Sequence, residues 1–233
     1  MKYCLVDSRI SEVELKELYK LGVEPLLCPK CDNLYDAISC HPDIQVFVLN
    51  QNNIIVHNQI NKDLLEKLHG LGKKIHFSKK ILSNKYPHDI ILNCFILGDL
   101  FIHNIKYTDE KIINLLPDNI KKINVKQGYS KCSTAIVNDK AVITTDPSIA
   151  KALSYEKVDV LYLPPGDIIL EGMNYGFIGG TCGLLNKNNI AFYGNLDKYM
   201  YGNEVKSFLK KYKINWHCLA DSRLVDRGSI LML

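Results

Sequence analysis

The chain has 233 residues, of which 47% are hydrophobic and 23% charged, and its formal net charge is +4. This length is enough to bury a sizeable core in one large domain or two small ones. The sequence contains no run long and apolar enough to span a membrane and does not start with a signal pattern, so we expect a cytoplasmic protein without membrane contact.

The predicted elements follow one order along the chain: strand, strand, helix, strand. The N-terminal part lacks the first of these strands and gives a strand over 2–8, a helix over 11–22 and a strand over 23–29. Four complete units follow, and the chain ends on one unpaired first strand. The first complete unit has a strand pair over 43–57, a helix over 61–72 and a third strand over 73–78, and the second has these elements over 89–103, 108–116 and 120–126. The third unit has a strand pair over 126–144, a helix from 146 and a third strand over 160–163. The fourth has a strand pair over 180–194, a helix over 202–213 and a third strand over 214–220, and the last strand is 223–233.

Capping residues mark where three of these helices begin. Ser11 and Glu14 have the spacing of a capping box. Asp146 is followed by a proline at the first helical position, and Thr108 or Asp109 caps the helix of the second complete unit.

The spacing of the first strands indicates an internal repeat. They begin near Asp43, Asp89, Lys131, Gly179 and Arg227, in steps of roughly 42 to 48 residues, which is the range of repeat architectures. Because the two chain ends complete one split unit, we expect their strands to pair and close a ring. The sequence predicts a single α/β domain, a five-bladed α/β propeller of ββαβ repeats around a pseudo-fivefold axis. The blades span about 41–86, 87–127, 128–173, 174–220, and 221–233 joined to 1–40.

A closed ring of five ββαβ units resembles the guanidino-modifying-enzyme superfamily, also called penteins. It includes arginine and agmatine deiminases, dimethylarginine hydrolases and amidinotransferases, and a non-enzymatic initiation factor that keeps ribosomal subunits apart shares the fold. The segments HPDI, GYSKCS, GFIGG and DRGSIL resemble an uncharacterised bacterial family of this fold. The resemblance implies that a cysteine of the fifth blade attacks a guanidinium carbon, a histidine moves protons, and acidic residues bind the cation.

Only the acidic part of that set has counterparts in this sequence. Asp43 in CHPDIQVFV and Asp89 in PHDIIL match acidic positions loosely, whereas Leu231 stands where the resemblance implies the cysteine. The fourth-blade segment GFIGGTCG supplies no histidine. The resemblance therefore implies an acidic axial pocket without the usual Cys/His pair.

Three residues are candidates for relocated catalysis. Cys182 follows glycines whose N–H groups are suited to an oxyanion, but it is also a candidate buried thiol. Cys132 adjoins Lys131, whose charge would lower a thiol pKa if both faced one space, although neighbours on a strand point to opposite faces. His41, beside Asp43, is a candidate base or a histidine satisfied by local backbone.

Further candidates surround the predicted axis. The two glycines at 179 and 180 would leave a hollow or let backbone approach a ligand. We expect a small cationic ligand to be bound there by Asp43, Asp89, Asp226, Arg227, Lys131, Gly179 and Gly180.

The cysteines and basic doublets carry weaker signals. Eight cysteines are scattered through apolar runs, which indicates reduced, buried thiols. Cys28 and Cys31 have metal or redox spacing, yet chance is the favoured interpretation over a metal or redox pair, and we expect no metal and no cofactor. The basic doublets lack interleaved aromatic residues, so we expect no nucleic-acid partner.

Three functional hypotheses follow, and the sequence leaves open whether the chain is an enzyme. The first is a non-catalytic protein that binds a small cationic or guanidino ligand in the axial pocket. The second is a guanidino hydrolase or amidinotransferase with Cys132 or Cys182 as nucleophile and His41 as base. The third is a scaffold that binds a ribosome or protein partner. The oligomeric state stays open.

Overall fold

The computed structural model describes residues 2–233, which form fifteen strands. The strands are β1 (Lys2–Asp7), β2 (Val23–Cys28), β3 (Val46–Val48), β4 (Asn53–Val56), β5 (Lys74–Phe77), β6 (Phe95–Leu97), β7 (Leu100–His103), β8 (Lys121–Asn124), β9 (Thr134–Asn138), β10 (Ala141–Thr144), β11 (Asp159–Tyr162), β12 (Cys182–Asn186), β13 (Asn189–Phe192), β14 (Asn215–Cys218) and β15 (Leu231–Met232).

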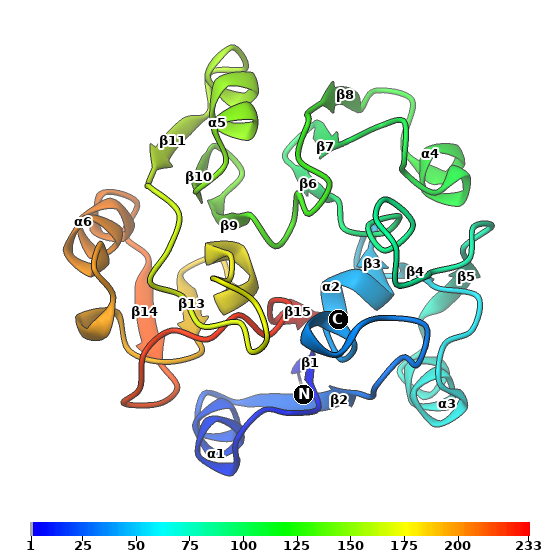
Figure 1. Ribbon diagram of the computed structural model, residues 1–233, viewed down its shortest axis with the longest axis horizontal. Helices are drawn as coiled ribbons and strands as arrows, with labels where there is room; N and C mark the ends of the chain where they lie inside the picture. The colour runs from blue at the N-terminus through cyan, green and yellow to red at the C-terminus, as the bar shows by residue number, and fades with distance from the viewer. Residues whose placement is uncertain (1) are drawn as a thin grey trace.

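Five three-stranded sheets stand around a common centre (Figure 1). Their strand orders are β3-β4-β5, β6-β7-β8, β9-β10-β11, β12-β13-β14 and β15-β1-β2. In each sheet the first pair is antiparallel and the second pair is parallel, as the chain returns through a helix. The predicted five-bladed α/β propeller is confirmed.

The helices lie mostly on the outside of the ring (Figure 1). Ser11 and Glu14 form the predicted capping box, Asp109 rather than Thr108 caps α4, and Asp146 caps α5. The helices are α1 (Glu12–Lys20), α2 (Pro42–Gln45), α3 (Lys62–Gly70), α4 (Glu110–Leu115), α5 (Pro147–Ser154) and α6 (Gly202–Lys211).

The two ends of the chain close the ring. Strand β15 pairs with β1 in an antiparallel register that sets Cys4 opposite Met232 and Leu5 opposite Leu231. Neighbouring blades share apolar clusters: Phe95 of one sheet packs in the same cluster as Val142 of the next. The blades are thus joined by side chains as well as by the closing strand pair.

All five segments predicted as strand starts have another conformation; Asp89 lies in a turn before β6, and Arg227 lies in irregular chain before β15. Pro42 occupies the first turn of α2, so Asp43 lies on a short helix and β3 begins only at Val46. Cys132 lies in a turn before β9, and residues 178–181 form a short 3-10 turn before β12. The prediction of extended strands at these positions is wrong, because each chain segment turns sharply near the axis before its strand begins.

No helix within residues 2–233 is both long and apolar enough to cross a membrane.

Candidate functional site

The turns that precede the five first strands are joined by a ring of hydrogen bonds around the axis. Each bond links one blade to the next, and most of them use backbone groups, so the ring depends on the fold more than on individual side chains. In order, the bonds are Asp43 N–H to Gly228 O (3.2 Å), Asn93 Nδ2 to Asp43 O (3.0 Å), Cys132 N–H to Asn93 Oδ1 (3.2 Å), Gly180 N–H to Cys132 O (2.9 Å) and Ser229 N–H to Gly180 O (2.9 Å).

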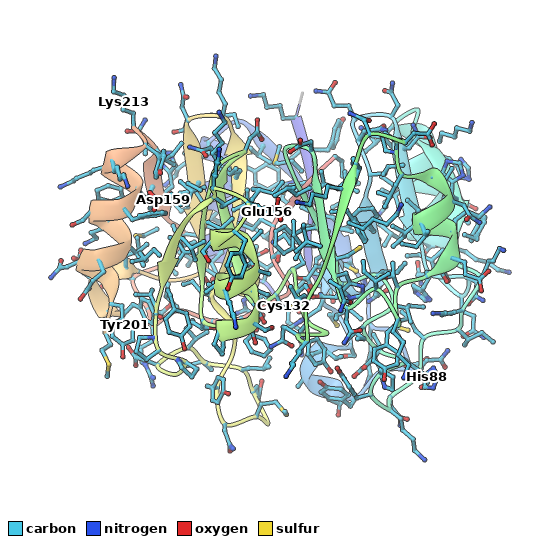
Figure 2. All side chains as sticks on the ribbon, turned by 90° about the horizontal axis from the view of Figure 1, so that it is seen from above. His88, Cys132, Glu156, Asp159, Tyr201 and Lys213 are labelled. Atoms are coloured by element: carbon cyan, nitrogen blue, oxygen red, sulfur yellow. The ribbon has the colours of Figure 1, made fainter. Side chains whose placement is uncertain are left out.

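Cys132 lies inside this ring and is only 2% exposed. Its thiol lies 3.0 and 3.1 Å from the two carboxylate oxygens of Asp43, to which it donates, and its sulfur accepts from Asn93 Nδ2 at 3.3 Å. Burial, together with the carboxylates of Asp43 and Asp226, holds the pKa of the Cys132 thiol well above its usual value. The resting thiol is therefore protonated at neutral pH. Figure 2 shows Cys132 nearer the end of the molecule that carries His88 and Tyr201 than the end that carries Lys213.

His41 lies beside this thiol and has no hydrogen-bond partner on either ring nitrogen, although it is fully buried. Nδ1 lies 3.9 Å from an oxygen of Asp226, and Nε2 lies 4.0 Å from an oxygen of Asp7. A Cβ at position 228 would lie 2.3 Å from the His41 Cβ, so a glycine is needed there. An unpartnered buried imidazole is uncommon in folded proteins and is typical of a site that binds a ligand.

A cavity of about 260 Å³ opens onto these groups. Its polar lining includes His41, Cys132 and Asp226, and Asp226 is held by the N–H groups of Phe177 and Gly228 at 2.8 and 3.0 Å. Burial raises the pKa of the Asp226 carboxyl. The remaining lining is Asn174 and a mainly apolar and aromatic set: Tyr35, Ile38, Tyr129, Leu170, Met173, Tyr175 and Phe177.

The structure brings four of the sequence candidates together: His41, Cys132, Asp43 and Asp226. A fifth, Asp89, lies behind the cavity wall, where it accepts a hydrogen bond of 2.5 Å from a tyrosine hydroxyl that lines the cavity. Burial raises the pKa of the Asp89 carboxyl.

Other candidates do not reach this cavity. Cys182 packs on β12 and donates only to the Ile178 carbonyl, at 3.6 Å, and burial raises its pKa to about 12. Arg227 donates to the carbonyl of Arg9 and lines a neighbouring depression. Lys131 lines two smaller cavities between the first strands and donates to Ser229 at 2.8 Å.

The two candidate glycines serve close packing rather than a hollow. A Cβ at Gly180 would lie 1.8 Å from an oxygen of Asp226, and one at Gly179 would lie 2.3 Å from the carbonyl oxygen of Thr134. The expectation that these glycines leave space for a ligand is wrong, because protein atoms fill that space.

One group of metal-ligating side chains occurs among the described residues. Donor atoms of His41, Asp43 and Cys132 all lie within 4.8 Å of one another. Thiol, imidazole and carboxylate are also the groups that cysteine enzymes use for nucleophilic attack and proton transfer. Cys28 and Cys31 are free, buried thiols and belong to no such group within residues 2–233.

Sequence reasoning missed Asn93, Ser229 and Asp7. Ser229 donates to Asp43 at 2.7 Å or to a nearby carbonyl, so it links the carboxylate to Lys131. Asn93 interrupts the apolar run DIILNCFIL, and a lone polar residue in such a run is a signal that could have marked it. Asp7 gave no such signal, because a polar residue at the end of a predicted strand is ordinary.

Comparison with known families gives one match, over residues 5–231, to the family described as "Family of unknown function (DUF6873)". The chain belongs to this family. No curated protein matches the sequence.

Solved structures similar to this DUF6873 protein are guanidino-modifying enzymes. Inosamine-phosphate amidinotransferase from Streptomyces griseus is 13% identical with a TM-score of 0.59, over 91% of this chain and 74% of that one. DDAH from Pseudomonas aeruginosa, in complex with citrulline, is 11% identical with a TM-score of 0.55, over 94% and 92%. Agmatine deiminase from C. jejuni with bound substrate is 11% identical with a TM-score of 0.53, over 94% and 87%. These likenesses show that the fold is the pentein fold.

Proposed function

We propose that this protein uses Cys132 to attack the central carbon of a small guanidinium or amidinium compound and so releases an amine or ammonia. The observation that carries the proposal is the thiol and imidazole of Cys132 and His41, which line one cavity beside the buried carboxylates of Asp43 and Asp226. The fold relatives include amidinotransferases, DDAH and agmatine deiminase, and they supply the substrate class.

Asp43 is the acceptor for the thiol proton in this proposal. Its carboxylate is the group to which Cys132 donates, whereas no hydrogen bond joins Cys132 to His41. The hypothesis from sequence made His41 the base for the thiol. The geometry supports a different division, in which His41 serves the leaving nitrogen.

The reaction then has two steps whose protons balance. Cys132 gives its proton to Asp43, the sulfur forms a bond to the guanidinium carbon, and the C–N bond to the leaving amine breaks as His41 protonates that nitrogen. Next, water, or an acceptor amine in a transfer reaction, adds to the carbon and gives its proton to His41. The C–S bond breaks, and Asp43 returns the first proton to Cys132.

Charge compensation explains how a protonated thiol is activated. Two carboxylates and burial raise the Cys132 pKa in the empty site. A bound cation beside Asp43 and Asp226 offsets their charge and favours the thiolate at the moment when its target carbon is present. A neutral ligand supplies no such compensation, so the site favours cationic substrates.

The test is turnover together with detection of a covalent adduct. Wild-type protein is incubated with a panel of alkyl and aryl guanidines and amidines, amine or ammonia release is measured, and trapped adducts are located by mass spectrometry. We expect turnover and an adduct on Cys132, with loss of at least about a thousandfold in Cys132→Ser. Cys182→Ala is the matched control, since this thiol is also buried but lies outside the cavity.

The opposite results are equally definite. Ligand binding without an adduct or turnover on the whole panel would support the non-catalytic ligand pocket instead. Equal turnover in Cys132→Ser and wild type would exclude Cys132 as the nucleophile.

A further inference from the structure

The residues that line the catalytic cavity indicate which substituent the substrate carries beside its reactive group. Three tyrosines and a phenylalanine line it, with ring centroids 6.1 Å apart for Tyr129 and Phe177 and 6.2 Å apart for Tyr175 and Phe177. Leu170 and Met173 extend the apolar surface towards the rim. Among the residues that the structure describes, no lysine or arginine lines this cavity.

Two of the three tyrosine hydroxyls in the wall, those of Tyr35 and Tyr129, donate their protons within the protein. Tyr129 donates to Asp89 at 2.5 Å, and Tyr35 Oη lies 3.1 Å from Tyr129 Oη. Because a hydroxyl has one proton, Tyr35 donates to Tyr129, and the free lone pairs of both oxygens can only accept. Asn174 and Tyr175 add neutral polar groups to this lining. The cavity therefore offers acceptors and aromatic faces to N–H donors and cations, whereas the described residues that line it offer no lysine or arginine to a carboxylate.

Two arginines lie close to this cavity but outside it. Arg9 and Arg227 line a neighbouring depression that shares Asp226 with the cavity. Arg9 donates to both oxygens of Asp7, and Arg227 donates to the Arg9 carbonyl and lies 3.7 Å from Glu14. Neither guanidinium lines the cavity, so neither is placed to bind the carboxylate of an amino-acid substrate held there.

We propose that the substrate is a guanidine or amidine whose remaining substituent is apolar or aromatic and carries no carboxylate. This inference rests on the proposed function and narrows its substrate class. The cavity of about 260 Å³ holds roughly nine water-sized groups, since each water takes about 30 Å³ in the liquid. That size fits a compound such as phenylguanidine or n-butylguanidine. The cation lies against Asp226 and the thiol of Cys132, which is hydrogen-bonded to Asp43, and the substituent lies against the rings of Tyr129 and Phe177.

The test compares guanidines with and without a carboxylate, and n-butylguanidine and 4-guanidinobutyrate are the pair that differs only in that group. Binding of n-butylguanidine, phenylguanidine and 4-guanidinobutyrate to Cys132→Ala is measured by calorimetry, which removes turnover from the comparison. We expect the first two compounds to bind at least about tenfold more tightly than 4-guanidinobutyrate, because burying an unpaired carboxylate is costly. Equal or tighter binding of 4-guanidinobutyrate or arginine would overturn the inference, as would the absence of binding by all compounds.

A second variant tests the ligand preference of the cavity with a substitution that should not disturb folding. Met173 is 52% exposed at the rim, so Met173→Arg should fold, and it introduces the missing cation. In the Cys132→Ala background, this substitution should lower the ratio of the affinity for n-butylguanidine to the affinity for 4-guanidinobutyrate at least about threefold. A purely structural role of Met173 would leave that ratio unchanged. An unchanged preference would contradict the inference. If n-butylguanidine binds with the expected preference but wild type does not turn it over, the proposed function fails while the specificity of the cavity stands.

Discussion

A cationic electrophile should modify Cys132 much faster than a neutral one of the same shape. Chloroacetamidine carries an amidinium, and chloroacetamide is its neutral analogue. Because the thiol lies 3.0 Å from an oxygen of Asp43, an amidinium that reaches the sulfur lies within about 4 Å of the carboxylate. At an effective dielectric constant of about 20 this pair contributes about 4 kcal/mol. Desolvation of the cation offsets roughly half of this energy. The remaining ~2 kcal/mol makes modification by the cationic reagent about thirtyfold faster than modification by the neutral one.

The assay follows modification by intact mass and locates the label by peptide mapping. Asp43→Asn should lower the rate ratio of the two reagents by about tenfold, and this ratio is informative because both reagents attack the same thiolate. Cys132→Ala should lose the label, whereas Cys182→Ala should keep it at the wild-type rate. A ratio near one in wild type, or a ratio that Asp43→Asn leaves unchanged, would refute the electrostatic reasoning.

Three further predictions concern pH, packing and a hydroxyl contact. Since the pKa of the Cys132 thiol is raised above 9.0, its alkylation by chloroacetamide should keep rising with pH beyond 9, and a plateau below about pH 8 would contradict the burial argument. Gly180→Ala sets a Cβ 1.8 Å from an Asp226 oxygen and should lower the free energy of unfolding by roughly 3 kcal/mol in a urea titration. Gly70→Ala, which meets open space, should change it by less than about 1 kcal/mol. Ser229→Ala removes a hydrogen bond to the carboxylate that takes the thiol proton and also removes the partner of Lys131 Nζ, so kcat should fall about tenfold and the free energy of unfolding by about 1–3 kcal/mol in the same urea titration.

Much of the fold could be predicted because each repeat carries its own local signals. The Ser11/Glu14 capping box and the Asp146 cap act within one helical turn, so the sequence alone locates those helix starts. The order of strands and helices then follows from repetition. The first strands were harder, because α2 and the turn around Cys132 are short and depend on contacts near the axis rather than on local propensity.

The candidate site was only partly predictable. His41, Asp43 and Cys132 were each singled out, but the contact between Asp43 and Cys132 joins residues 89 positions apart, and no periodicity or cap reports such a pair. Cys182 looked equally suitable in sequence, and its separation from the site depends on which way the chain turns after residues 178–181. Asn93 and Ser229 matter because they hydrogen-bond to residues of other blades, which only the assembled ring brings close.

The hydrogen-bonded ring around the axis also limits how this protein can evolve. In open repeat arrays a unit can be added or lost at an end, because each unit contacts only its neighbours. Here every blade supplies a link in one closed circuit, from Asp43 through Asn93, Cys132 and Gly180 to Ser229. Deleting or duplicating a blade would break the circuit and separate the thiol from its carboxylate. The number of blades is therefore fixed, while the helices and loops outside the ring are free to diverge.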